Sequence, residues 1–199
     1  MTKSELLAHM PPLYRVARSW RDRRHEQAHE PTRAKHDLLR QVARDRGLRT
    51  LVETGTYTGE TAWAFRRAFD RIETIELEPT LARLARIRFA TTKNVNVHEG
   101  DSATMLPRIL ESVREPAIFW LDAHPCTDRA VRGTAIPLLA ELAAIAAHPI
   151  AGHVVLIDDL RLMGTSGYPS VDALAPPGFA LQQIGDVAVL TPAGHTSRA

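Results

Sequence analysis

Acidic residues follow short apolar runs along most of this chain, and their type and spacing could do chemistry. They are Glu53, Glu76, Asp101, Asp122, Asp158 and Asp159. A carboxylate can accept hydrogen bonds from sugar hydroxyls, stabilise a cationic group or ligate a divalent metal. The apolar runs are typical of buried strands, so we expect these acids at strand ends, where open α/β sheets bind their ligands.

The first run ends in Glu53-Thr54-Gly55-Thr56-Tyr57-Thr58-Gly59. Two glycines flanking a strand-to-helix turn let the backbone approach a ligand closely, although glycine pairs also serve ordinary turns. Glu53 is more informative, because its carboxylate would repel the pyrophosphate of NAD or FAD but stabilise the ammonium group of a methionine moiety. The loop therefore favours S-adenosylmethionine over a dinucleotide. The predicted cofactor-binding residues of this loop are Glu53, Gly55, Tyr57, Thr58 and Gly59.

Two later segments offer contacts for the rest of that cofactor. An acid about 20 positions beyond a glycine loop can accept from both ribose hydroxyls, and we assign this role to Glu76. Glu78, before Pro79, is predicted to cap the next helix. Asp101 is placed to accept from an adenine amine, and Ser102 to contact the ring or cap a helix. Surface exposure or simple capping is the alternative for these residues.

Asp122, Asp158 and Asp159 end two further runs and are predicted to meet in one crevice. Three carboxylates there repel one another unless protons or a cation intervene, and oxygen-only ligands suit Mg²⁺. The alternative is that Asp158 and Asp159 orient backbone groups and no metal binds. His124 is the candidate general base or an additional ligand, so His124 and Asp122 are the predicted catalytic residues; a solvent-exposed loop histidine is the alternative.

The elements that must position these residues alternate along the chain. Strands are predicted at residues 49–53, 73–77, 94–98, 117–122 and 153–158, and helices at residues 61–69, 80–89, 103–113 and 136–147. This order predicts a parallel sheet with right-handed crossovers. Residues 179–184 and 187–190, joined only by Gly185 and Asp186, predict an antiparallel hairpin. The expected fold is a doubly wound, mostly parallel, seven-stranded α/β sheet with one reversed strand, as in class I methyltransferases.

Two helices are predicted before the alternation, at residues 4–24, interrupted by Pro11 and Pro12, and at 33–46, ended by Gly47. We therefore expect a helical extension over residues 1–47 and one methyltransferase domain over residues 48–199. Five arginines between residues 15 and 24 form a solvated helix face or a docking surface for an anionic substrate or nucleic acid.

Composition limits the setting. A chain of 199 residues with 44% hydrophobic and 24% charged residues is typical of one globular domain. The single cysteine, Cys126, cannot form an internal disulfide, which favours the cytoplasm. No apolar stretch is long enough to span a bilayer, and residues 1–20 lack the apolar core of a signal peptide.

The series of motifs resembles cation-dependent catechol and caffeoyl-CoA O-methyltransferases. The resemblance covers residues 50–164 and runs in order through the glycine loop, Glu76, Gly100-Asp101-Ser102, Asp122, Asp158-Asp159 and Gly164. It implies that Asp122 is the first metal aspartate and that Asp158-Asp159 replaces an Asp-Asn metal pair; an Asp-Asp pair also occurs in macrocin-type sugar O-methyltransferases. A group of bacterial proteins with little known chemistry shares residues 52–57, 119–124 and 157–159 and a Tyr168-Pro169-Ser170 segment, which implies the same fold and cofactor.

One position departs from that pattern. Catechol-type enzymes carry a catalytic lysine where this chain has Pro125, so His124, a carboxylate or a metal must promote proton loss. The departure favours a sugar or another secondary-metabolite hydroxyl over a catechol. We expect an S-adenosylmethionine-dependent O-methyltransferase for a small hydroxylated molecule, with Mg²⁺ as a candidate second cofactor. The alternatives are a nucleic-acid methyltransferase and a non-catalytic domain that binds S-adenosylmethionine or adenosine; a NAD-dependent oxidoreductase is disfavoured by Glu53. A homodimer is left open.

Overall fold

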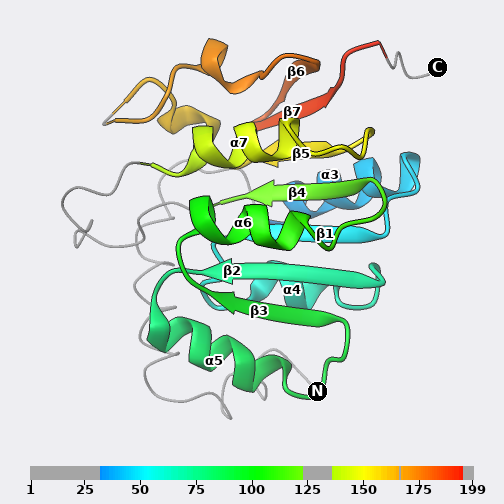
Figure 1. Cartoon of the computed structure of the whole chain (residues 1–199), viewed down its shortest axis with the longest axis vertical. Helices are drawn as coiled ribbons and strands as arrows, with labels where there is room; N and C mark the ends of the chain where they lie inside the picture. Colours follow the sequence, from blue (N-terminus) through cyan, green and yellow to red (C-terminus); the bar gives the residue numbers. More distant parts are fainter. Residues whose placement is uncertain (1–31, 123–135, 166, 195–199) are drawn as a thin grey trace.

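A seven-stranded sheet forms the centre of the computed structural model, which describes residues 32–122, 136–165 and 167–194 (Figure 1). The strands are β1 (Thr50–Thr54), β2 (Arg71–Glu76), β3 (Val95–Glu99), β4 (Ala117–Leu121), β5 (Val154–Ile157), β6 (Phe179–Ile184) and β7 (Val187–Pro192). The helices are α3 (Thr32–Asp45), α4 (Glu60–Phe65), α5 (Pro79–Phe89), α6 (Ser102–Leu110) and α7 (Leu138–Ala146), with short 3₁₀ helices η1 (Leu160–Leu162) and η2 (Val171–Leu174).

The strand order is β3-β2-β1-β4-β5-β7-β6. Strands β1 to β5 pair in parallel, and β7 lies antiparallel between β5 and β6. Ile184 pairs with Val187, so Gly185 and Asp186 form the two-residue turn between β6 and β7. This arrangement confirms the predicted doubly wound sheet with one reversed strand.

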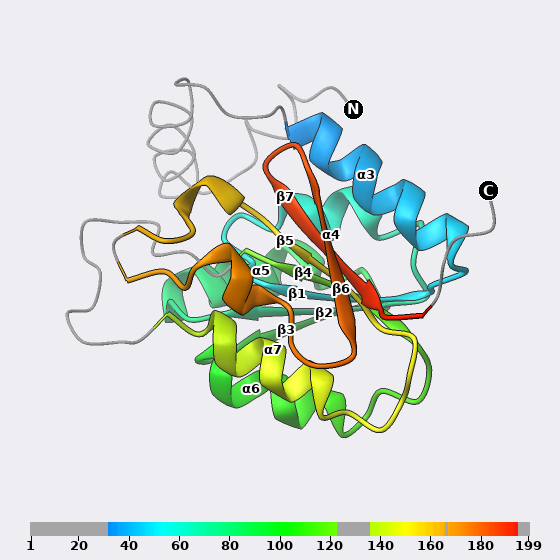
Figure 2. The same ribbon diagram turned by 90° about the horizontal axis from the view of Figure 1, so that it is seen from above.

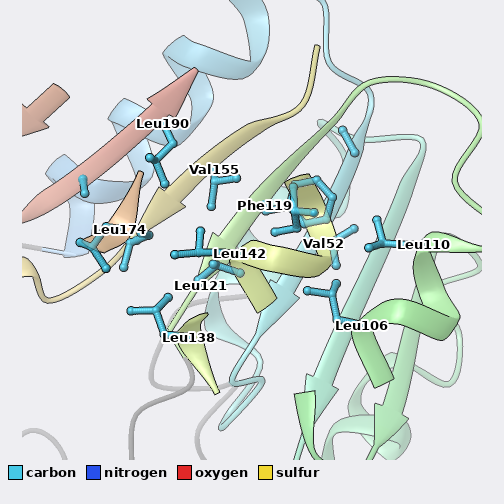
Figure 3. Packing of buried hydrophobic residues seen from close by; sticks show 14 of the residues in the cluster. Val52, Leu106, Leu110, Phe119, Leu121, Leu138, Leu142, Val155, Leu174 and Leu190 are labelled. Carbon is cyan, nitrogen blue, oxygen red and sulfur yellow. The ribbon is translucent and has the colours of Figure 1, made fainter. Parts of the chain in front are cut away.

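Helices cover both faces of the sheet, α3, α4 and α5 on one side and α6 and α7 on the other (Figure 2). Side chains alternate between these faces along each strand. In β1, Leu51 packs among α3, α4 and α5, whereas Val52 packs toward α6 and α7. Figure 3 shows Val52 beside Phe119 and Leu106 in the second of these cores. Fully burying one such side chain contributes about 1.5–3 kcal/mol to folding.

Helix α3 belongs to the core. Leu39 and Ala43 are buried in the same cluster as Leu51. After the helix, Gly47 takes a left-handed conformation (φ 62°), and the Leu48 N–H bonds the Ala43 carbonyl at 2.8 Å, a typical glycine-based helix end. The division of the chain at residue 47 stays a prediction, and the helix predicted at residues 4–24 lies outside the described residues.

None of the described helices has the length and apolar character needed to cross a membrane.

Candidate active site

Four of the predicted site acids lie on the face of the sheet that α3, α4 and α5 cover. Strand alternation places Glu53 on the same side as Leu51, and Glu76 on the same side as Ile72. Asp122 and Asp158 follow the last residues of β4 and β5, two positions after the buried residues Trp120 and Leu156 of that cluster.

The backbone fixes these last two acids at the sheet edge. The Asp122 N–H bonds the Thr54 carbonyl, and the Asp158 N–H bonds the Leu121 carbonyl, each at 3.0 Å. The parallel ladder therefore continues one residue beyond each strand and brings both acids to the same edge.

Glu53 is a buried acid with neutral partners. Glu53 is only 2% exposed, and the Thr74 hydroxyl donates to its Oε2 at 2.6 Å. The hydroxyls of Thr56 and Thr74 share a hydrogen bond of 2.6 Å. Burial, aided by the charge of Asp122, outweighs the hydrogen bond from Thr74 and raises the pKa of Glu53 to about 8. At neutral pH this carboxyl holds a proton until a cation comes close.

Glu76 fixes the shape of the glycine loop. Its Oε2 accepts from the Tyr57 N–H at 2.7 Å and its Oε1 from the Glu78 N–H at 2.9 Å. Tyr57 has a left-handed backbone (φ 46°), which is uncommon outside glycine and is held here by that hydrogen bond. Burial raises the pKa of Glu76, while these backbone donors oppose the increase. Each carboxylate oxygen has a second lone pair, so Glu76 retains acceptor capacity.

The helix starts near the loop have clear local causes. Glu78 Oε2 accepts from the Leu81 N–H at 2.7 Å ahead of Pro79, which confirms the capping role predicted for Glu78. Asp101 Oδ1 accepts from the Ala103 N–H at 2.9 Å, so Asp101, and not Ser102, caps α6. Ser102 is buried at the first position of that helix. Contacts of Asp101 and Ser102 with adenine stay predictions.

The two loop glycines are required by conformation. Gly55 (φ 87°) and Gly59 (φ 70°) both lie in the left-handed region. A Cβ on Gly59 would also lie 2.8 Å from a ring carbon of Phe89. The Arg88 guanidinium donates to the Thr58 carbonyl and ties the loop to α5. Gly59 thus serves the packing of α5, and a contact of Gly59 or Thr58 with cofactor stays a prediction.

A buried lysine meets the pair of aspartates after β5. Lys35, from α3, contacts Asp158 Oδ1 and places its Nζ 3.0 Å from Asp159 Oδ1 and 3.8 Å from Asp186 Oδ2. Arg161 bonds Asp159 Oδ1 at 2.6 Å and also contacts Asp186. Asp159 has a left-handed backbone (φ 57°), and its N–H donates to Asp158 Oδ1 at 2.7 Å.

This cluster differs in composition from the predicted metal trio. In the described part of the chain, carboxylate oxygens of Asp158, Asp159 and Asp186 lie within 4.8 Å of one another, and Asp122 is not in this compact group. The charge of Asp122 nevertheless affects Asp158 through space. Burial raises the pKa of Asp158, and the charges of Asp122 and Asp159 raise it further against the contact with Lys35. Burial lowers the pKa of Lys35, but the two aspartates outweigh it, so the pKa is raised and Lys35 stays charged.

Sequence reasoning did not identify Lys35, Arg161 or Asp186 as site residues. The signal for Lys35 was present, since it precedes Leu39 and Ala43 by one and two helical repeats and so lies on the buried stripe of α3. A lysine on such a stripe needs a buried acid as partner.

Two polar atoms near the strand ends have no hydrogen-bond partner in the described parts of the chain. They are the Thr54 hydroxyl at the end of β1 and the Trp120 indole N–H in β4, and both are buried. Buried polar groups are nearly always paired, so these two atoms are exceptions among the described residues. His124, the candidate base, and Pro125 lie outside the described residues.

No protein-family model and no curated protein matches the sequence. Solved structures do match the fold. An O-methyltransferase from Bacillus cereus in complex with SAH is 18% identical with a TM-score of 0.62, and the match covers 95% of this chain and 94% of that one. The O-methyltransferase TomG from Streptomyces achromogenes, in complex with SAM, is 18% identical with a TM-score of 0.63, covering 92% and 89%. The SAH-bound methyltransferase PaMTH1 from Podospora anserina is 16% identical with a TM-score of 0.60, covering 92% and 88%. At these identities the likeness establishes the fold, and this chain has the fold of these class I methyltransferases.

Proposed function

We propose that this chain is an S-adenosylmethionine-dependent O-methyltransferase that acts on a small hydroxylated molecule. The observation that carries the proposal is Glu76, a buried acid at the end of β2 whose carboxylate also holds the Tyr57 N–H of the glycine loop. The structural neighbours crystallised with SAH or SAM support the same reading.

The residues at the strand ends fit this cofactor. Glu53, buried and protonated when alone, suits a site that receives the ammonium group of the methionine moiety. Glu76 has acceptor capacity for the ribose, because each of its oxygens has a second lone pair. The remaining proposed contacts are Gly55, Tyr57, Thr58, Gly59, Asp101 and Ser102. The bound cofactor supplies an electrophilic methyl group.

The chain's own task is to bind and align the acceptor. Holding the acceptor oxygen in line with the methyl group removes much of the entropic barrier, and a general base then takes the hydroxyl proton. We assign the role of general base to His124, two residues after Asp122. The proposed setting is the cytoplasm, since the one cysteine cannot form an internal disulfide.

The residues present do not fit the predicted Mg²⁺. Asp158 and Asp159 already contact the Lys35 ammonium, and Asp159 and Asp186 contact Arg161. Mg²⁺ would need oxygens at about 2.0–2.1 Å in near-octahedral geometry, and a buried ammonium between them opposes that arrangement. The proposed reaction therefore includes no metal step.

Calorimetry with S-adenosylhomocysteine and NAD tests the proposed function. We expect S-adenosylhomocysteine to bind and Glu76→Ala to weaken it by about 1–3 kcal/mol, because two hydrogen bonds to a charged group are lost. Glu78→Ala is the matched control, since it removes a helix cap two residues away and leaves ligand affinity near that of the wild type. Tight NAD binding without S-adenosylhomocysteine binding would refute the proposal.

A further inference from the structure

The Lys35 side chain is only 9% exposed and is inserted between acids from distant parts of the chain. We propose that the Lys35 ammonium is a built-in cation for the strand-end acids, and that it takes the place a divalent ion has in cation-dependent O-methyltransferases. The proposal rests on the proposed function only for its catalytic consequence; the exclusion of metal stands on the cluster itself.

Lys35 forms two hydrogen bonds and one longer ion pair with the acids around it. An ammonium has three donors. Two reach Asp158 Oδ1 and Asp159 Oδ1, and Asp186 Oδ2 lies 3.8 Å away. A buried charge is stable only when it is paired and hydrogen-bonded, so Lys35 and the two aspartates behave as one unit. Removing either side would leave an uncompensated buried charge.

Arg161 adds a second cation to the cluster. Its guanidinium contacts Asp159 and Asp186, and the Arg161 N–H also bonds Asp186 Oδ1 at 2.9 Å. Each of the three acids in the compact group therefore has a cationic partner within the chain. A divalent ion would have to displace the Lys35 ammonium and bind next to the Arg161 guanidinium.

The arrangement makes Lys35 a positioning residue. It ties α3 to the end of β5 and, through Asp186, lies beside the β6–β7 turn, so it sets the orientation of Asp158 and Asp159.

Electron paramagnetic resonance of Mn²⁺ tests this inference, because free Mn²⁺ loses signal when a protein binds it. We expect the wild type to leave the signal unchanged, with and without S-adenosylhomocysteine. Lys35→Ala removes the ammonium and should bind Mn²⁺ at least about tenfold more tightly than the wild type, as expected when a paired carboxylate cluster loses its cation. Lys93→Ala, in an exposed loop, is the matched control and should behave as the wild type does.

The outcomes separate this inference from the proposed function. A wild type that binds one Mn²⁺ per chain, with the binding lost in Asp158→Asn, overturns the inference even if S-adenosylhomocysteine binds. A folded Lys35→Ala variant that binds Mn²⁺ no better than Lys93→Ala also overturns it. If Lys35→Ala does not fold, the wild-type titration alone decides. Failure of S-adenosylhomocysteine to bind would count against the proposed function and not against the role of Lys35.

Discussion

Replacing Glu53 by glutamine should change how stability depends on pH. The carboxyl ionises near pH 4.5 in the unfolded chain, whereas burial raises its pKa to about 8 in the folded protein. The stability that comes from the protonated form is fully present below pH 4.5 and is lost as the pH rises toward 8. Glutamine is neutral throughout and can still accept the hydrogen bond from Thr74.

The magnitude follows from the difference between the two pKa values. Converted to free energy, it limits the contribution of protonated Glu53 to stability to about 5 kcal/mol. Relaxation around the ionised group reduces this contribution. As the pH rises from about 5 to about 8, we therefore expect the free energy of unfolding of Glu53→Gln to increase by about 2–4 kcal/mol relative to that of the wild type. Urea titrations at both pH values give the free energies of unfolding. Glu111→Gln, on an exposed residue at the end of α6, is the control and should follow the wild type.

The same residue links pH to ligand binding. If the ammonium of S-adenosylhomocysteine approaches Glu53, binding near neutral pH should release about one proton from the wild type. Calorimetry in buffers of different ionisation enthalpy measures this release, which Glu53→Gln should abolish. A stability difference between the two proteins that does not vary with pH would refute the reasoning about burial.

Three further predictions follow from other positions. Burial and the neighbouring His148 lower the pKa of His153 to about 4, so the free energy of unfolding should fall by up to about 3 kcal/mol as the pH drops from 6.5 toward 4. Urea titrations measure this fall, and His153→Gln should reduce it. Gly59→Ala should lower the free energy of unfolding by about 1–3 kcal/mol, because a left-handed residue gains a Cβ against the Phe89 ring; an unchanged urea midpoint would contradict this. His124→Gln should lower kcat about a hundredfold with cofactor affinity unchanged, and a variant that keeps its rate and the acidic limb of its pH profile would assign the proton elsewhere.

Periodicity predicted most of the fold correctly because the buried strands are short apolar runs separated by amphipathic helices. The Gly185-Asp186 turn predicted the reversed strand for the same local reason. Element ends were less accurate, because pairing with neighbours decides them. Strand β2 begins at Arg71, not residue 73, since Arg71 pairs with Thr50 of β1. Leu77, predicted as strand, follows β2 and is 57% exposed.

The acids of the site were predictable, but their partners were not. A carboxylate at a strand end is a local pattern, so Glu53, Glu76 and Asp158 could be located without a structure. The contact between Lys35 and Asp158 spans 123 positions in the chain, and only the packing of α3 on the sheet creates it. The same holds for Asp186, which reads as an ordinary turn residue until the hairpin brings it beside Arg161.

A crystal structure with S-adenosylhomocysteine would test the central claim most directly. We expect the ligand at the carboxyl ends of β1 and β2, with both ribose hydroxyls on Glu76 and the amino-acid moiety beside Glu53. Lys35 should still contact Asp158 and Asp159. A ligand bound elsewhere, or one that leaves Glu76 without a ribose contact, would contradict it.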